Sequence, residues 1–133
     1  NYLNTVPENL NLKNEFDIIL NLEVVEHVEN LDLYLSSCSG LLKQKGIMFT
    51  ATINKTLTSY VKAIVGAEYI LRWLPIGTHD WNKFIKPEEL EKKLTELNFS
   101  ITSLTGLSYN PIFQEWKRTK DMSVNYIIVG NKS

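Results

Sequence analysis

The sequence has only one cysteine, Cys38, among its 133 residues. A single thiol excludes an intramolecular disulfide and a zinc site built from several cysteines, and it is typical of a protein from a reducing compartment. Because no catalytic pattern surrounds Cys38, we expect it to be a small buried residue of a helix.

The sequence also lacks an excess of positive charge. Its formal net charge is −1, which argues against nucleic acid as a partner, because such binding needs a basic surface. Residues 1–32 carry seven acidic residues and one lysine, whereas residues 55–86 carry five basic and two acidic residues. A basic middle segment is compatible with an anionic surface or partner, and equally with an ordinary solvated face.

No internal repeat, low-complexity stretch or N-terminal signal peptide is visible. With 44% hydrophobic residues, the chain is long enough for one domain over residues 1–133. It opens on Asn1, in polar sequence that leads directly to an apolar strand pattern. This pattern indicates an internal start, with an upstream part missing.

The first half of the chain has the pattern of a strand, a helix and a second strand. Phe16 to Leu20 form an apolar run typical of a strand covered on both faces. Asn30 can cap a helix that Gly46 ends as a C′ glycine, and residues 47–53 read as a second buried strand. A crossover of this length favours a parallel βαβ unit.

The second half begins with a segment, residues 55–86, whose apolar residues surround a helix instead of forming one stripe. The segment can be a core helix with a loop packed over it, a substrate lid or a monotopic membrane contact. Its charged residues exclude a transmembrane span. Pro87 then starts a shorter helix that Asn98 closes. We expect the strands at 99–107 and 123–129 to pair as antiparallel neighbours.

A cluster of polar residues follows the first strand. Glu23, Glu26 and His27 have the spacing i, i+3 and i+4, which converges on one face if the chain turns helical there. Ligands bind at the carboxyl ends of strands in open α/β sheets. Two carboxylates and an imidazole suit magnesium, manganese, iron or zinc. The alternative is that these acidic residues only stabilise a helix start.

Several motifs are shared with a known family. The general ones are Phe16-Asp17-Ile18-Ile19, Glu26-His27-Val28 and Leu42-Lys43 before Gly46. The specific ones lie at residues 65–72, 77–80, 83–87, 105–107, 109–111 and 124–126. On these motifs, the sequence resembles the C-terminal portion of a class I S-adenosylmethionine-dependent methyltransferase, and more closely the ubiquinone-biosynthesis O-methyltransferase family.

The resemblance implies an α/β fold, a partial Rossmann-like class I methyltransferase sheet that contains the fourth strand onward. Helices would lie on both faces, the last strands would form an antiparallel hairpin, and residues from about 55 to 86 would form a helical lid insertion. The glycine-rich loop and the acidic residue that hold most of the cofactor would lie upstream of this chain.

The implied activity is methylation of a phenolic hydroxyl on a polyprenylated catechol or demethylubiquinol intermediate of ubiquinone biosynthesis. The alternatives are another small-molecule class I methyltransferase, or a non-catalytic fragment that folds by self-association as a homodimer through an exposed sheet edge. The expected location is cytoplasmic, peripheral at the inner face of a membrane, or on the matrix side of a mitochondrion in a eukaryote.

The resemblance also implies site residues. Thr5 and Val6 would lie beside the adenine of S-adenosylmethionine, and Asn21 and Leu22 would face this cofactor from the strand end. A divalent metal, magnesium in the first place, would be held by Glu23, Glu26 and His27.

Two histidines have further candidate roles. His27 can act instead as a general base. His79 can complete the metal ligand set or lie near the substrate ring, as a second catalytic residue, or it can simply be a loop histidine bonded to Asp80.

Overall fold

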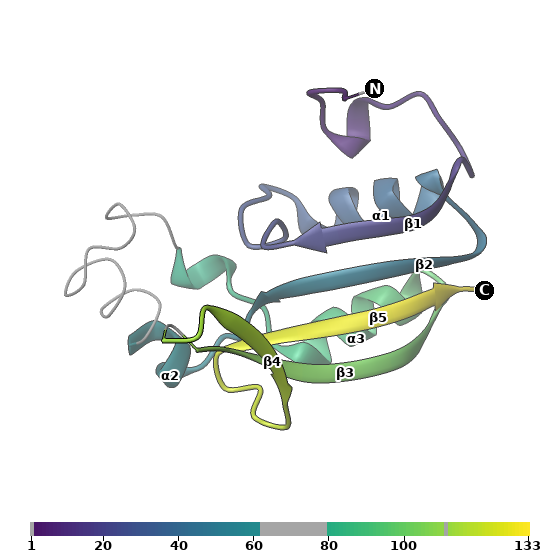
Figure 1. Ribbon diagram of the computed structural model, residues 1–133. Coiled ribbons are helices and arrows are strands. Elements are labelled where there is room, and N and C mark those ends of the chain that lie inside the picture. The colour runs from purple at the N-terminus through teal and green to yellow at the C-terminus, as the bar shows by residue number, and fades with distance from the viewer. Residues whose placement is uncertain (1, 62–79, 111) are drawn as a thin grey trace.

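The computed structural model describes residues 2–61, 80–110 and 112–133. Within these ranges, five strands form one sheet in the order β1-β2-β5-β3-β4 (Figure 1). The strands are β1 (Phe16–Leu22), β2 (Leu42–Ile53), β3 (Phe99–Asn110), β4 (Glu115–Thr119) and β5 (Asn125–Lys132). The helices are η1 (Pro7–Asn9), α1 (Leu31–Leu41), α2 (Leu57–Ser59), η3 (Trp81–Lys83) and α3 (Pro87–Glu96).

The pairing of the strands confirms the predicted βαβ unit. β1 and β2 run parallel, with Leu20 opposite Phe49, and α1 connects them. β5 lies between β2 and β3 and is antiparallel to both, which confirms the predicted pairing of the last strands. The hairpin of β3 with β4, in which Tyr109 lies opposite Trp116, was not predicted.

Both α1 and α3 cover the same face of the sheet, because their buried residues share one core with the same side of β2 and β5. The connections β1–α1–β2 and β2–α3–β3 link parallel strands and move in the same direction across the sheet. Right-handed crossovers in one direction place their helices on one face. The expectation of helices on both faces is therefore met on one face only within the described residues.

The core lies between this covered face and the two helices. The buried residues that form it include Val25, Tyr34, Leu35, Cys38, Leu42, Met48, Ile85, Leu90, Leu94, Phe99, Tyr126 and Ile128. Cys38 is buried, as predicted from its helical position. The Tyr126 hydroxyl donates to the Ile85 carbonyl at 3.0 Å, so the loop before α3 is tied to the middle of the sheet.

The two ends of α1 compare differently with the sequence prediction. Asn30 caps the helix, because its Oδ1 accepts from the Leu33 amide at 3.0 Å. The prediction that Gly46 ends the helix was wrong, since α1 stops at Leu41 and Gly46 belongs to β2. A Cβ on Gly46 would lie 2.6 Å from Leu42 Cγ, so a close approach of the chain to Leu42 is what requires glycine.

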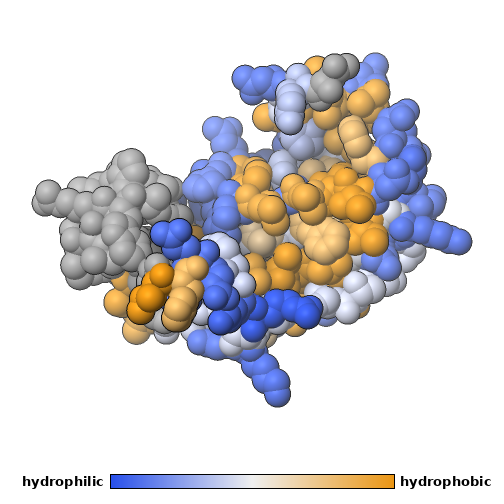
Figure 2. All heavy atoms as spheres, in the orientation of Figure 1, coloured by the Kyte–Doolittle hydropathy of each residue, from blue (hydrophilic) through white to orange (hydrophobic). Residues whose placement is uncertain are grey.

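The opposite face of β1 is uncovered in the described residues. Phe16, Ile18, Leu20 and Leu22 are 41%, 56%, 61% and 52% exposed, and Figure 2 shows apolar side chains gathered on this side of the sheet. The prediction of a strand covered on both faces was wrong for the described residues, because α1 and α3 cover only one of the two faces between which the side chains of β1 alternate. β1 is also an edge strand of the described sheet.

Most of the predicted lid at residues 55–86 lies outside the described residues. At its start, Thr56 caps α2 with a reciprocal capping box to Ser59. At its end, the Trp81 ring packs edge-on against Tyr60 and Phe84, at centroid distances of 5.5 and 5.7 Å. None of the helices described here is long and apolar enough to cross a membrane.

Candidate cofactor pocket

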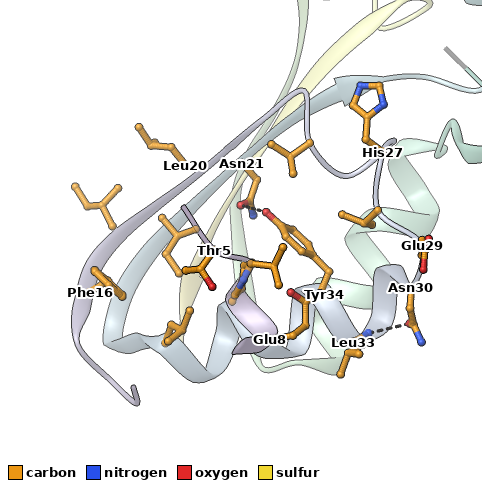
Figure 3. A pocket seen from close by; sticks show the side chains of 18 residues that line it. Thr5, Glu8, Phe16, Leu20, Asn21, His27, Glu29, Asn30, Leu33 and Tyr34 are labelled. Atoms are coloured by element: carbon orange, nitrogen blue, oxygen red, sulfur yellow. Dashed lines mark hydrogen bonds between the residues drawn. The ribbon is translucent and has the colours of Figure 1, made fainter. Parts of the chain in front are cut away.

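A cavity of about 850 Å³ opens between the N-terminal segment, β1 and α1 (Figure 3). Thr5 and Val6 contribute from the segment before η1, Asn21 from the end of β1, and Tyr34 from α1. Aliphatic side chains form much of the remaining wall: Ile18, Ile19, Leu20, Val24, Val28, Leu33 and Leu41. A concave, mostly apolar cavity with a few polar groups is typical of a small-molecule site.

Three of the four residues predicted to face a cofactor meet at this cavity, namely Thr5, Val6 and Asn21. Leu22 does not line it. Leu22, the last residue of β1, lies on the uncovered face and is 52% exposed, whereas Phe16, Ile18 and Leu20 on that same face do line the cavity. Contact of these residues with a cofactor stays a prediction.

Asn21, Tyr34 and Cys38 form a buried polar group at the cavity wall. The Tyr34 hydroxyl donates to Asn21 Oδ1 at 2.9 Å, the bond drawn between the two labelled residues in Figure 3. Burial raises the pKa of the Tyr34 phenol well above its ordinary value, so the phenol keeps its proton. Burial also raises the pKa of the Cys38 thiol to about 11, despite smaller lowering effects of the neighbouring Tyr34 and Asn21 side chains.

The segment after β1 does not continue as the helix that the spacing of the glutamates predicted. Glu23 has a left-handed backbone with φ 55°, and its amide donates to the Ala51 carbonyl at 2.9 Å. The His27 amide then donates to the Val24 carbonyl in a turn. The backbone of Glu23 is therefore bonded to β2, and turns follow where a helix was predicted. Glu23, Glu26 and His27 consequently do not lie on one helical face.

Glu23 and Glu26 nevertheless come together. Glu26 is only 1% exposed, and its Oε2 accepts from the Thr52 hydroxyl at 2.6 Å. Its Oε1 has no hydrogen-bond partner within the described residues. Glu23 is exposed as a residue, but burial of its carboxyl group, then the charge of Glu26 and a hydrogen bond with Glu26 raise its pKa to about 8.

This pair fits part of a metal site. Magnesium in proteins is often held by one or two carboxylates together with water or substrate oxygens, and the unsatisfied Glu26 Oε1 offers one such oxygen. Among the described residues, however, no group of three or more His, Cys, Asp and Glu side chains could hold a metal ion. His27 is exposed and lines the cavity, and His79 lies outside the described residues.

Sequence reasoning missed the roles of Thr52 and the Tyr34 hydroxyl. The sequence pattern placed Tyr34 within the helix after Asn30 and Thr52 within the buried strand at 47–53, without a hydrogen-bond partner for either. The available signal was the pair of threonines, Thr50 and Thr52, inside an otherwise apolar strand. Buried hydroxyls need partners, and in a parallel pair the partner of Thr52 can come from just beyond the neighbouring strand.

Solved structures with similar folds identify the fold of this chain. A methyltransferase from Thermotoga maritima, described as a possible histamine N-methyltransferase, matches with a TM-score of 0.67 at 19% identity, over 96% of this chain and 61% of that one. The magnesium protoporphyrin IX methyltransferase from Synechocystis with bound SAH matches with a TM-score of 0.62 at 19% identity, over 97% and 49%. The fold is that of class I S-adenosylmethionine-dependent methyltransferases.

The sequence comparisons agree with this class, and the chain belongs to the methyltransferase-domain family, whose model matches residues 3–104. It is similar to two ubiquinone biosynthesis O-methyltransferases. The protein from Pelagibacter ubique is 58% identical over 91% of this chain and 50% of its own length. The protein from Mesorhizobium japonicum is 52% identical over 88% of this chain and 47% of its own length. The chain thus spans about half the length of the curated relatives it matches.

Proposed function

We propose that the protein containing this chain is an S-adenosylmethionine-dependent O-methyltransferase of ubiquinone biosynthesis. Its substrate would be a polyprenylated catechol or demethylubiquinol, methylated on a phenolic hydroxyl. The observation that carries the proposal is the 58% identity to a ubiquinone biosynthesis O-methyltransferase over 91% of this chain. The methyltransferase fold supports it independently of sequence identity.

S-adenosylmethionine would occupy the cavity between the N-terminal segment, β1 and α1. The cavity runs along β1 from Phe16 and reaches the carboxyl end of the strand at Asn21, and open α/β sheets bind ligands at the carboxyl ends of their parallel strands. Its aliphatic wall suits a flat heterocycle such as adenine, with Thr5 and Val6 beside it. Asn21 supplies a buried amide at the strand end.

Methyl transfer requires a phenolate, because the neutral phenol is a poor nucleophile. The phenolic oxygen forms a bond to the methyl carbon as the bond from that carbon to sulfur breaks. The phenolic proton leaves to a base, and His27 at the cavity wall is a candidate. The carboxylates of Glu23 and Glu26 would hold a divalent metal, with magnesium favoured. When bound, the metal would stabilise the negative charge of the phenolate.

The proposal includes a location and an assembly. A polyprenylated substrate favours a peripheral position at a membrane, on the cytoplasmic or matrix side, with residues 55–86 and His79 near the substrate. The alternative function is that of a non-catalytic fragment that folds by self-association. The exposed face and edge of β1 favour such a homodimer of the isolated chain.

The test uses the full-length protein with labelled S-adenosylmethionine, a catechol substrate and magnesium. We expect label on the phenolic oxygen and its loss after chelation. The double substitution of Glu23→Ala and Glu26→Ala should abolish the stimulation by magnesium, whereas Glu15→Ala, an exposed control before β1, should leave it unchanged. Absence of label on the phenol contradicts the proposed activity, and activity that survives both chelation and the double substitution contradicts the metal.

A further inference from the structure

Asn21 has one half of its amide satisfied and the other half not. Its side chain is held at the end of β1, where the residue is only 2% exposed. Oδ1 accepts the Tyr34 hydroxyl at 2.9 Å. Nδ2 is buried and has no hydrogen-bond partner among the described residues, and the residue lines the cavity proposed for the cofactor.

A buried donor without an acceptor reduces the stability of a folded protein, so such groups are few and are often found where a ligand completes the bond. The nearby Cys38 thiol does not fill this role well, because sulfur is a weak acceptor. The amide nitrogen of Asn21 is thus available for an acceptor atom that enters the cavity.

Tyr34 determines which end of the amide is available. Burial keeps the phenol protonated, and its proton goes to Asn21 Oδ1. A reversed amide would direct nitrogen at the phenol and leave the phenolic proton without this acceptor. The hydrogen bond therefore holds the amide with its oxygen toward Tyr34 of α1, as drawn in Figure 3, and leaves its nitrogen without a partner among the described residues.

We propose that Tyr34 is a positioning residue that, through Asn21 Oδ1, directs the Asn21 amide nitrogen to a hydrogen-bond acceptor of S-adenosylmethionine in the cavity. The inference rests on the proposed function, because it takes the cofactor of that function as the ligand. Acceptor atoms occur on both the adenosine and the amino-acid halves of the cofactor. The chemistry required is the same for both halves, namely a lone pair that receives an amide N–H.

The experiment measures the dissociation constant of S-adenosylhomocysteine by calorimetry with the full-length protein. We expect Asn21→Ala and Tyr34→Phe each to weaken binding by about 3- to 10-fold, the range for one neutral hydrogen bond. The double variant should weaken binding by the same factor as Asn21→Ala alone, because the Tyr34 hydroxyl affects the ligand only through the Asn21 amide. Asn21→Asp, which keeps an acceptor for Tyr34 and removes the N–H donor, should also weaken binding.

The matched control is Tyr126→Phe, which removes another buried tyrosine hydroxyl, the one bonded to the Ile85 carbonyl. It should lower the melting temperature and leave the dissociation constant unchanged, so it separates a structural loss from a binding loss. Adenosine, measured with the same variants, assigns the acceptor. An unchanged adenosine affinity places the acceptor on the amino-acid half, and a reduced one places it on adenosine.

An unchanged dissociation constant for Tyr34→Phe overturns the inference, as does a double variant in which the two losses multiply. If Tyr34→Phe does not fold, tight binding by Asn21→Asp overturns it instead. A parent protein that does not bind S-adenosylhomocysteine contradicts the proposed function, and this inference falls with it. A parent protein that binds, with variants that bind equally well, contradicts this inference alone.

Discussion

Glu23 and Glu26 make the stability of the chain depend on pH. Burial of the Glu23 carboxyl group and the adjacent Glu26 raise the pKa of Glu23 from 4.5 to about 8. A carboxyl group with a raised pKa binds its proton more readily in the folded state. The contribution of Glu23 to stability is therefore most favourable below its unfolded pKa, and it declines as the pH rises from about 4.5 through about 8.

The corresponding prediction is that Glu23→Gln, which cannot ionise, melts at a higher temperature than the parent at about pH 9 and at nearly the same temperature at about pH 4. Thermal unfolding in the presence of a chelator measures this difference. Glu15→Gln is the control, an exposed glutamate before β1. Equal melting temperatures of Glu23→Gln and the parent at high pH would show that the carboxyl group ionises without cost.

The sequence predicted the positions of individual residues better than it predicted their hydrogen-bond partners. Thr5, Val6 and Asn21 meet at the cavity as expected, since a strand end and the segment packed beside it can be located from pattern. The helical spacing of Glu23 and Glu26 correctly predicted that the two side chains are close, but the helix on which that prediction rested does not form. The two glutamates adjoin because Glu23 bonds to the backbone of β2, and a tertiary hydrogen bond of this kind has no local signal.

Among the secondary-structure elements, α1 offers the clearest test of a sequence signal. Asn30 Oδ1 accepts from the Leu33 amide, which would otherwise lack a partner at the helix start. We expect Asn30→Ala to lower the free energy of unfolding by about 1 kcal/mol, and Asn30→Asp to keep most of it. Denaturant titration measures both variants.

The control for the cap is Ser36→Ala in the same helix. Ser36 is exposed, and its hydroxyl bonds back to the Leu33 carbonyl, so it does not satisfy an amide at the helix start. We expect a much smaller change there. A loss for Ser36→Ala as large as that for Asn30→Ala would mean that the cap contributes nothing beyond general helix propensity.

Capping and periodicity were sufficient to predict α1, α3 and the parallel strands, because these signals are local. They failed at Gly46 and at β4. Gly46 looked like a C′ glycine, but it is required by the approach of the chain to Leu42 at the start of β2. In β4, apolar and polar residues alternate only weakly, and the sequence before it contains turn signals. The hairpin is therefore evident only from the pairing of Tyr109 with Trp116 in the structure.

For the whole molecule, the direction of the two crossovers determines which apolar residues of β1 are exposed. Both helices cover one face, so the apolar residues of β1 on the other face are exposed within the described chain, together with the edge of β1. The parallel βαβ unit and the antiparallel pairing of β3 with β5 were predictable from sequence. The common side of the helices becomes evident only when both crossovers are known to move in the same direction across the sheet.

A contiguous exposed apolar patch next to an open strand edge favours association. We therefore expect the 133-residue chain to associate with increasing concentration, as measured by light scattering or sedimentation. Leu20→Lys, at the most exposed apolar position of β1, should shift the chain toward monomer, because a charge there opposes burial of this face. The melting temperature should change little, since the side chain is already 61% exposed.

Leu57→Lys is the matched control for this substitution. Leu57 is 76% exposed, in α2 and away from β1, so the same change in charge and size occurs off the patch. Association should then be unchanged. If both variants reduce association equally, net charge and not the β1 face controls it. If the parent chain is monomeric at every concentration, the exposed face of β1 does not bind a second copy of the chain.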